Sequence, residues 1–221
     1  MISVLLVDDH VLVREGLKSL LQNVKGIKVI GDAKSGEEAV DISKQKSPDV
    51  VIMDVRMPGI GGLEATKKIL RSNPETKIIA LTVMDEEPIP SIFLQAGASG
   101  YLTKGSDLEE MLRAIKSVYA GKRYLTSEVA QQLALKHVSD DNSSPFDNLS
   151  EREVQIMLMI TSGQKVQEIS DKLFLSPKTI NSYRYRLFSK LTVKSDVELT
   201  RLAMRHGIID NHNIIERETS E

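Results

Sequence analysis

The sequence predicts an α/β fold, a five-stranded doubly wound parallel sheet, followed by a second, all-α domain. Two apolar runs, Val4–Val7 and Val50–Met53, are typical of strands buried on both faces, as in parallel sheets. Such runs alternate with segments of helical periodicity through about 120 residues, and five β-α units in that length predict a doubly wound sheet. After residue 148 only helical patterns remain.

Five strands and five helices are expected to alternate within residues 1–121. The strands are predicted at Val4 to Val7, Ile27 to Ile30, Val50 to Asp54, Lys77 to Thr82 and Tyr101 to Lys104. The helices are predicted at Val13 to Val24, Ser35 to Lys44, Leu63 to Leu70, Pro90 to Gly97 and Leu108 to Tyr119. Ser35 and Glu38 have the spacing of a capping box. The glycine-rich run from Gly59 to Gly62 matches no phosphate-binding fingerprint, so it indicates only a turn.

Residues 122–147 are predicted to be a linker with one short helix. Ser127 can cap that helix, which is expected to end near Lys136, and the run from Ser139 to Pro145 is polar and turn-rich. Residues 148–210 hold four short helices, the first opened by a capping box at Ser150 and Glu153, and residues 211–221 are a polar tail. The expected core of this domain is Ile156, Ile160, Ile169, Leu173, Ile180, Leu187, Leu191 and Leu199.

The composition is that of an ordinary globular protein, with 41% hydrophobic and 27% charged residues. No apolar run is long enough for a membrane span, and no signal peptide is recognised. The absence of cysteine excludes disulfides and thiol chemistry. We therefore expect a cytoplasmic protein with no membrane partner. The four histidines show no metal-ligand spacing.

Charge is divided unevenly along the chain. The overall net charge is −2, but residues 149–209 hold ten Lys or Arg and six Asp or Glu, a net charge of +4, so the remainder carries −6. An acidic first part and a basic second part suggest different partners, with nucleic acid a candidate for the second.

Polar residues end four of the predicted strands. Asp54 follows the apolar run of its strand, Asp8 and Asp9 follow the first strand, and Thr82 and Lys104 end the fourth and fifth. Ligands of open parallel sheets bind beyond the carboxyl ends of the strands, so these groups are expected to meet. Three carboxylates close together in a partly desolvated cleft either take up protons or bind a hard cation such as Mg²⁺. One carboxylate can also attack phosphorus to form an acyl phosphate. Each residue taken alone could equally be an ordinary strand end.

The predicted helix from Pro177 to Leu191 has two unlike faces. Its apolar face holds Ile180, Leu187 and Leu191. The opposite face is polar and partly basic, with Arg186 at its edge and Lys190 toward its side, and its centre holds Lys178, Asn181, Ser182, Tyr185 and Ser189. Amide, hydroxyl and phenol groups suit base edges, and flanking cations suit phosphates. A plain solvated helix face remains the alternative.

With these motifs the first domain resembles the receiver domain of response regulators, which has a flavodoxin-like fold, and the second resembles the LuxR-type helix-turn-helix. Together they resemble the NarL/FixJ family, most nearly its GacA/UvrY/LetA branch. The resemblance implies that Asp54 is the phospho-acceptor, and that Asp8, Asp9, Asp54 and the backbone carbonyl of Arg56 hold Mg²⁺. It also makes Thr82 the switch hydroxyl, Tyr101 the switch aromatic residue and Lys104 the partner of the phosphoryl group.

For the second domain the resemblance implies base contacts by Asn181, Ser182 and Tyr185, and a phosphate contact by Thr179. Lys178, Arg186 and Lys190 complete the expected DNA-binding set. The chain departs from the family pattern in two places. Gly105 follows the lysine where many receivers have proline, and Asn181 and Tyr183 stand where many LuxR-type domains have Lys and His.

The function expected from these features is that of a transcription factor, not an enzyme. A sensor histidine kinase or a phosphotransfer domain would phosphorylate Asp54, and phosphorylation would favour homodimers on paired DNA half-sites. One alternative is a DNA-binding regulator that ignores phosphorylation. Another is a magnesium-dependent phosphatase with Asp54 as nucleophile, which is disfavoured because Arg56 stands where phosphatases of the haloacid dehalogenase type have a second Asp.

Overall fold

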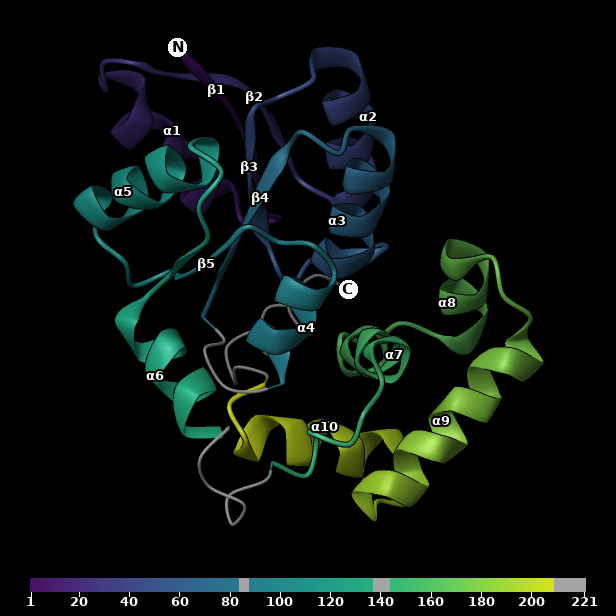
Figure 1. Ribbon diagram of the computed structural model, residues 1–221. Coiled ribbons are helices and arrows are strands. Elements are labelled where there is room, and N and C mark those ends of the chain that lie inside the picture. The colour runs from purple at the N-terminus through teal and green to yellow at the C-terminus, as the bar shows by residue number, and fades with distance from the viewer. Residues whose placement is uncertain (84–87, 137–143, 209–221) are drawn as a thin grey trace. The chain divides into compact units, whose positions relative to one another are not determined.

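The computed structural model describes residues 1–83, 88–136 and 144–208, which fall into two compact units. The first unit is an α/β domain and the second is a small helical domain (Figure 1). Most of the predicted linker run and the whole predicted tail lie outside the described residues. Within the described ranges, no helix is both long enough and apolar enough to cross a membrane.

The first domain is built on a parallel sheet with the strand order β2-β1-β3-β4-β5-β6. The strands are β1 (Ile2–Val7), β2 (Ile27–Ala33), β3 (Val50–Asp54), β4 (Lys77–Thr82), β5 (Gly100–Thr103) and β6 (Tyr124–Leu125). The doubly wound parallel sheet predicted from the sequence is therefore confirmed, but it has six strands and not five. The additional strand β6 has only two residues, which is too short to show a periodicity in the sequence.

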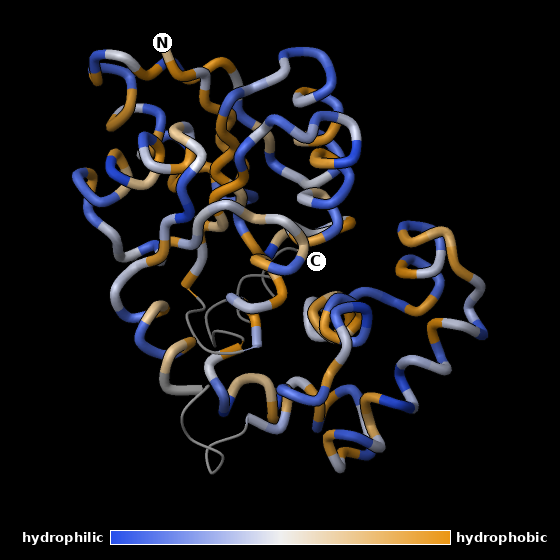
Figure 2. The backbone as a smooth tube through the Cα atoms, in the orientation of Figure 1, coloured by the Kyte–Doolittle hydropathy of each residue, from blue (hydrophilic) through white to orange (hydrophobic). Residues whose placement is uncertain are grey.

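Helices cover both faces of this sheet. The helices of this domain are α1 (Val11–Gln22), α2 (Gly36–Lys46), α3 (Gly61–Ser72), α4 (Ile89–Gln95), α5 (Leu108–Tyr119) and α6 (Ser127–Lys136). Side chains of α1 and α5 pack on one face, and those of α2 and α3 pack on the other. The apolar strands accordingly lie between helices whose outer surfaces are hydrophilic (Figure 2).

Strand β3 shows why its sequence is apolar throughout. Val50 and Ile52 belong to the core on the α1 and α5 side, whereas Val51 and Met53 belong to the core on the α2 and α3 side. Alternate side chains of a strand point to opposite faces, so a strand covered on both faces needs apolar residues at every position. All four are fully buried, and each such side chain contributes roughly 1.5–3 kcal/mol through burial.

Two helix starts differ in detail from the sequence prediction. The Ser35 hydroxyl accepts from the backbone of Glu38 as expected, but the Glu38 carboxylate accepts from Lys34 N and not from Ser35 N, so the capping box is half formed. Ser127 is the first residue of α6 and not its cap. Thr126, which is buried, caps α6 through its hydroxyl.

The second domain consists of α7 (Glu151–Thr161), α8 (Val166–Leu173), α9 (Pro177–Leu191) and α10 (Asp196–Arg205). All eight residues predicted for its core are buried, and the capping box of Ser150 and Glu153 is complete. Phe146, which the sequence assigned to the linker, is also fully buried, and the centroid of its ring lies 5.5 Å from that of His206 in an edge-to-face arrangement. The core of this domain therefore extends to residues before 148.

Candidate functional site

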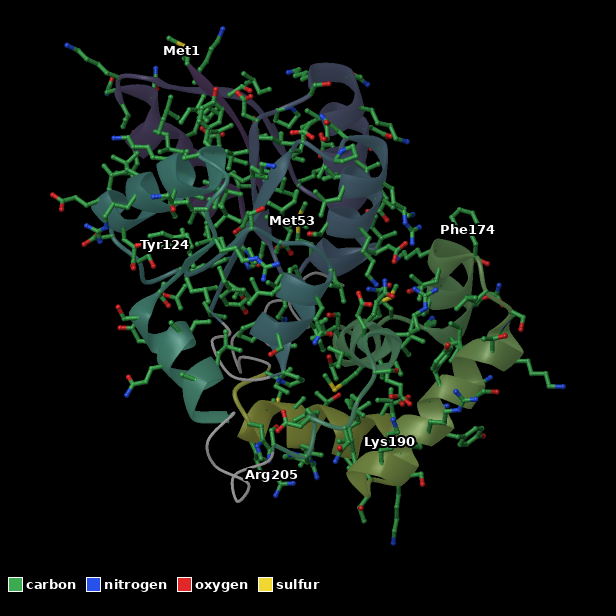
Figure 3. The ribbon with its side chains drawn as sticks, in the orientation of Figure 1. Met1, Met53, Tyr124, Phe174, Lys190 and Arg205 are labelled. Atoms are coloured by element: carbon green, nitrogen blue, oxygen red, sulfur yellow. The ribbon has the colours of Figure 1, made fainter. Side chains whose placement is uncertain are left out.

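The sheet brings the predicted acidic residues together at the carboxyl ends of its strands. Asp54 is the last residue of β3, directly after Met53, which Figure 3 labels. Asp8 follows β1, whose Val7 pairs with Met53 in the adjacent strand. Lys104 follows β5 and places its Nζ 2.7 Å from Asp8 Oδ2 and 3.0 Å from Asp54 Oδ2. One ammonium group thus bridges two carboxylates.

These carboxylates are shielded from solvent. Asp54 is 2% exposed and Asp8 is 1% exposed. Burial raises the pKa of Asp54 to about 7, with Lys104 opposing the rise and Asp8 adding to it. Burial also lowers the pKa of Lys104, but the two carboxylates outweigh burial and the net shift is upward. The cluster therefore favours a positive charge beside Asp54.

The donor set of this cluster fits a hard divalent cation. Carboxylate oxygens of Asp8, Asp9 and Asp54 lie within 4.8 Å of one another, in a group that also includes His10. Oxygen ligands of this kind suit Mg²⁺, which binds few carboxylates and retains water. Arg56 is adjacent, because its backbone N–H donates to Asp54 Oδ1 at 3.2 Å. The backbone that carries the predicted carbonyl ligand therefore lies beside the cluster.

The sequence did not identify His10 as a member of this cluster, because no histidine shows a metal-ligand spacing. Its Nδ1 lies 3.2 Å from Asp8 Oδ1 and 3.1 Å from Asp9 Oδ1. Its backbone N–H also donates to Asp8 Oδ1 at 2.8 Å. The signal that could have identified it is its position directly after the acidic pair.

The predicted switch residues lie on the two neighbouring strands. Thr82 ends β4 and is 1% exposed, and its carbonyl oxygen accepts from Lys104 N at 2.7 Å. Tyr101 lies on β5 and is fully buried, with its ring 6.5 Å from that of Phe93 in an edge-to-face arrangement. Thr82 thus lies next to the residue that contacts Asp54.

The glycine-rich run after β3, which the sequence indicated only as a turn, also allows a close backbone contact. Gly62 lies in the first turn of α3, and a Cβ at this position would collide with the backbone carbonyl oxygen of Asp54. Its N–H donates to Val55 O at 3.3 Å. Glycine is therefore required here, because α3 begins directly against the strand that carries Asp54.

In the second domain, α9 is opened by Ser176, whose hydroxyl accepts from Thr179 N at 3.1 Å, with Pro177 as the first helical residue. The expected polar face is present. Its exposed members are Lys178, Ser182, Tyr185, Ser189 and Arg186, and Asn181 is half-buried. Thr179, the expected phosphate contact, is also half-buried. The guanidinium of Arg186 lies over the ring of Tyr183 at 5.5 Å. The hydroxyl of Ser182 donates to Lys178 O at 2.9 Å.

Lys190 differs from the other predicted DNA-binding residues. Its Nζ donates to Glu153 Oε2 at 2.7 Å and to Asn148 O at 2.9 Å. A second cation of α9, Arg184, makes two hydrogen bonds of 2.7 Å to the carboxylate of Asp196. Both cations thus have partners within the domain, which the sequence did not reveal.

Two known families match separate parts of the chain. Residues 4–116 match the family described as "Response regulator receiver domain", and residues 147–203 match "Bacterial regulatory proteins, luxR family". The chain is 59% identical over 211 residues to response regulator GacA of Pseudomonas viridiflava, an alignment that covers 95% of this chain and 99% of GacA. It is 60% identical over 209 residues to response regulator UvrY of Escherichia coli K12, an alignment that covers 94% of this chain and 96% of UvrY.

A solved structure extends the likeness to the whole fold. RcsB from Salmonella enterica serovar Typhimurium, bound to promoter rprA in the presence of phosphomimetic BeF₃⁻, has a TM-score of 0.74 and 25% identity. That alignment covers 91% of this chain and 98% of the RcsB chain. The chain therefore belongs to the NarL/FixJ family of response regulators, transcription regulators that join a receiver domain to a LuxR-type DNA-binding domain.

Proposed function

We propose that this protein is switched by phosphorylation of Asp54. The observation that carries the proposal is the bridge of Lys104 between Asp54 and Asp8, with the carboxylate oxygens of Asp8, Asp9 and Asp54 gathered beside it. The Asp54 carboxylate attacks the phosphorus of a phosphohistidine on a sensor kinase or phosphotransfer domain. The new O–P bond forms as the P–N bond breaks, and the electron pair of that bond leaves with the imidazole.

Asp8, Asp9, Asp54 and the backbone carbonyl of Arg56 would hold Mg²⁺. When bound, the cation neutralises charge that develops on the phosphoryl oxygens. The nucleophile must be ionised to attack, and Lys104 favours the ionised form of Asp54. After transfer, the ammonium of Lys104 is placed to bind a phosphoryl oxygen.

The signal is proposed to leave the site through Thr82 and Tyr101. The hydroxyl of Thr82 turns toward the phosphoryl group to donate a hydrogen bond, and Tyr101 follows into the space that this movement opens. The support is their placement: Thr82 adjoins Lys104, and Tyr101 is buried against Phe93 on the next strand. A buried aromatic residue is a suitable element for two packing states.

Output is proposed to be sequence-specific DNA binding by α9 in the major groove. Asn181, Ser182 and Tyr185 would meet base edges, while Lys178, Thr179 and Arg186 would bind phosphates. RcsB, to which the chain is similar, is bound to a promoter in its solved structure. We also propose that phosphorylation favours homodimers that bind paired half-sites. Because the DNA of bacteria lies in the cytoplasm, we propose that the protein acts there.

The decisive experiment compares DNA affinity with and without acetyl phosphate and Mg²⁺, for the wild type and for Asp54→Asn. We expect acetyl phosphate to raise the affinity of the wild type only. Equal affinity in both conditions would identify a DNA-binding regulator that ignores phosphorylation. Sustained hydrolysis of small phosphoesters by the wild type would instead support a phosphatase.

A further inference from the structure

The DNA-binding helix α9 is held on both flanks by ion pairs inside its own domain. On one flank, Lys190 reaches Glu153 in the first turn of α7. On the other, Arg184 reaches Asp196, the first residue of α10. Lys190 is labelled on α9 in Figure 3. Neither pair involves the exposed polar face of the helix, so both are placed to fix its orientation.

The carboxylate that receives Lys190 is deeply buried. The side chain of Glu153 is 4% exposed, whereas that of Lys190 is 40% exposed. Glu153 Oε2 also accepts from Ser150 N at 2.7 Å and from Ser150 Oγ at 2.9 Å, which completes the capping box of α7. Burial opposes ionisation of Glu153, yet the bonds from Lys190 and Ser150 outweigh it and its pKa is lowered.

Moving the ammonium of Lys190 to a DNA phosphate would therefore have a cost. Glu153 would remain buried and ionised without its cation, and a buried charge that loses its partner is strongly destabilising. Asn148 O would lose its donor as well. Lys178, a lysine on the same helix, is exposed and makes no ion pair with any described residue, so its ammonium can move to a phosphate without leaving a buried carboxylate unpaired.

We propose that Lys190 is a positioning residue for DNA recognition, which with Glu153 sets the orientation of α9, and is not a phosphate ligand. The inference rests on the proposed DNA-binding function. This role differs from the phosphate contact that the sequence predicted for Lys190. Helical periodicity places Lys190 at the side of the polar face, but its partner there is Glu153 of α7, 37 residues earlier in the chain.

The substitution Glu153→Gln tests whether Lys190 is a positioning residue or a phosphate ligand, because the two roles predict opposite changes in DNA affinity. The amide retains an oxygen for Ser150 but removes the charge that holds Lys190, and it makes the chain less negative. A positioning pair predicts that the specific duplex binds about tenfold more weakly, because a misplaced α9 loses a base contact. A phosphate ligand predicts the opposite: the freed ammonium makes both specific and random duplex bind more tightly, which would overturn the proposal.

Lys190→Met and Lys178→Met form a matched pair for the salt dependence. Lys178→Met is expected to lower the slope of log affinity against log salt by about 0.9, the effect of one lost phosphate contact. Lys190→Met is expected to retain the wild-type slope and to lose preference for the specific duplex, and Lys190→Arg should restore that preference. A slope lowered by about 0.9 in Lys190→Met would also overturn the proposal.

These titrations use the full chain with Mg²⁺ and beryllofluoride, and a duplex that the wild type has selected from a random pool. Circular dichroism and thermal unfolding identify any variant that does not fold. If Glu153→Gln does not fold, the proposal is still tested by comparing Lys190→Met with Lys190→Arg in their salt slopes and in their preference for the specific duplex. If the wild type binds no duplex more tightly than random DNA, the proposed DNA-binding function is itself refuted. This result is obtained with the wild type alone, before any variant is compared.

Discussion

The guanidinium of Arg14 donates a hydrogen bond of 2.7 Å to the backbone carbonyl oxygen of Asp8, which ties helix α1 to the loop that carries the acidic pair. Arg14 is 9% exposed, and its Nε lies 3.4 Å from Asp32 Oδ2 at the end of β2. Lys18 binds the other oxygen of Asp32 at 3.0 Å. Arg14 therefore connects β1, α1 and β2 at the edge where the cation is expected.

Arg14→Met is expected to weaken Mg²⁺ binding about tenfold, since groups that orient metal ligands contribute this much to affinity. The variant retains an apolar stem but loses both hydrogen bonds, so the Asp8 loop is released. Calorimetric titration with Mg²⁺ measures the effect. Lys18→Met is the matched control, because Lys18 pairs with Asp32 but makes no described contact with the loop. Equal affinities of the two variants would contradict this role of Arg14.

Asp54→Asn is expected to abolish phosphoryl uptake from acetyl phosphate in the presence of Mg²⁺. The amide has nearly the same shape as the carboxylate but cannot act as the nucleophile. Incorporation is measured by the mass of the intact protein, with near-ultraviolet circular dichroism to show that the fold is retained. Undiminished incorporation in the variant would remove Asp54 from its proposed role.

The same substitution tests the electrostatics of the site. Burial raises the pKa of Asp54 to about 7 from its ordinary value of 3.8. Between these values the folded state holds a proton that the unfolded state has released, so wild-type stability falls as pH rises from about 4 to about 7. Asn carries no charge at any pH. In the absence of Mg²⁺, Asp54→Asn is therefore expected to be more stable than the wild type at pH 8.

The size of this gain follows from the shift, because one pKa unit corresponds to about 1.4 kcal/mol. A gain on the order of a few kcal/mol is expected at pH 8, and it should disappear near pH 4. Urea unfolding of both proteins across this pH range measures it. A stability difference that does not change with pH would mean that Asp54 is ionised in the folded protein over the whole range.

The sequence predicted elements whose pattern is local. Strand β3 could be predicted because all its residues before Asp54 are apolar, and the core of the helical domain followed from helical spacing. What it did not predict depends on how the folded segments contact one another. The bond between Arg14 and Asp8 requires α1 to fold back on its loop, and the pair of Lys190 and Glu153 joins two helices. Strand β6 was missed because two residues show no periodicity.

The fragment from Ser144 to Glu221 is expected to bind the selected duplex without phosphorylation, because this domain has its own core. It should begin at Ser144, since Phe146 is buried against His206 and Ser144 N–H donates to Asp147 at 2.9 Å. A fragment from residue 148 loses Phe146 and should be less stable by roughly 3 kcal/mol. Binding by the longer fragment only when it is joined to a phosphorylated receiver domain would mean that the receiver supplies the dimer.

The exposed face of α9 allows reading of bases to be separated from attraction to phosphates. Asn181→Ala removes an amide that can pair with adenine through two hydrogen bonds, a loss of roughly 1–3 kcal/mol against the preferred base only. It should therefore relax specificity at one position without changing the salt slope. Arg186→Ala removes an exposed cation that lies over Tyr183. It should weaken binding to all sequences alike and lower the salt slope by about 0.9.

Competition between specific and random duplex at several salt concentrations distinguishes the two results. If both variants lose specific and random affinity in the same proportion, α9 presents only a solvated face and another element reads the DNA.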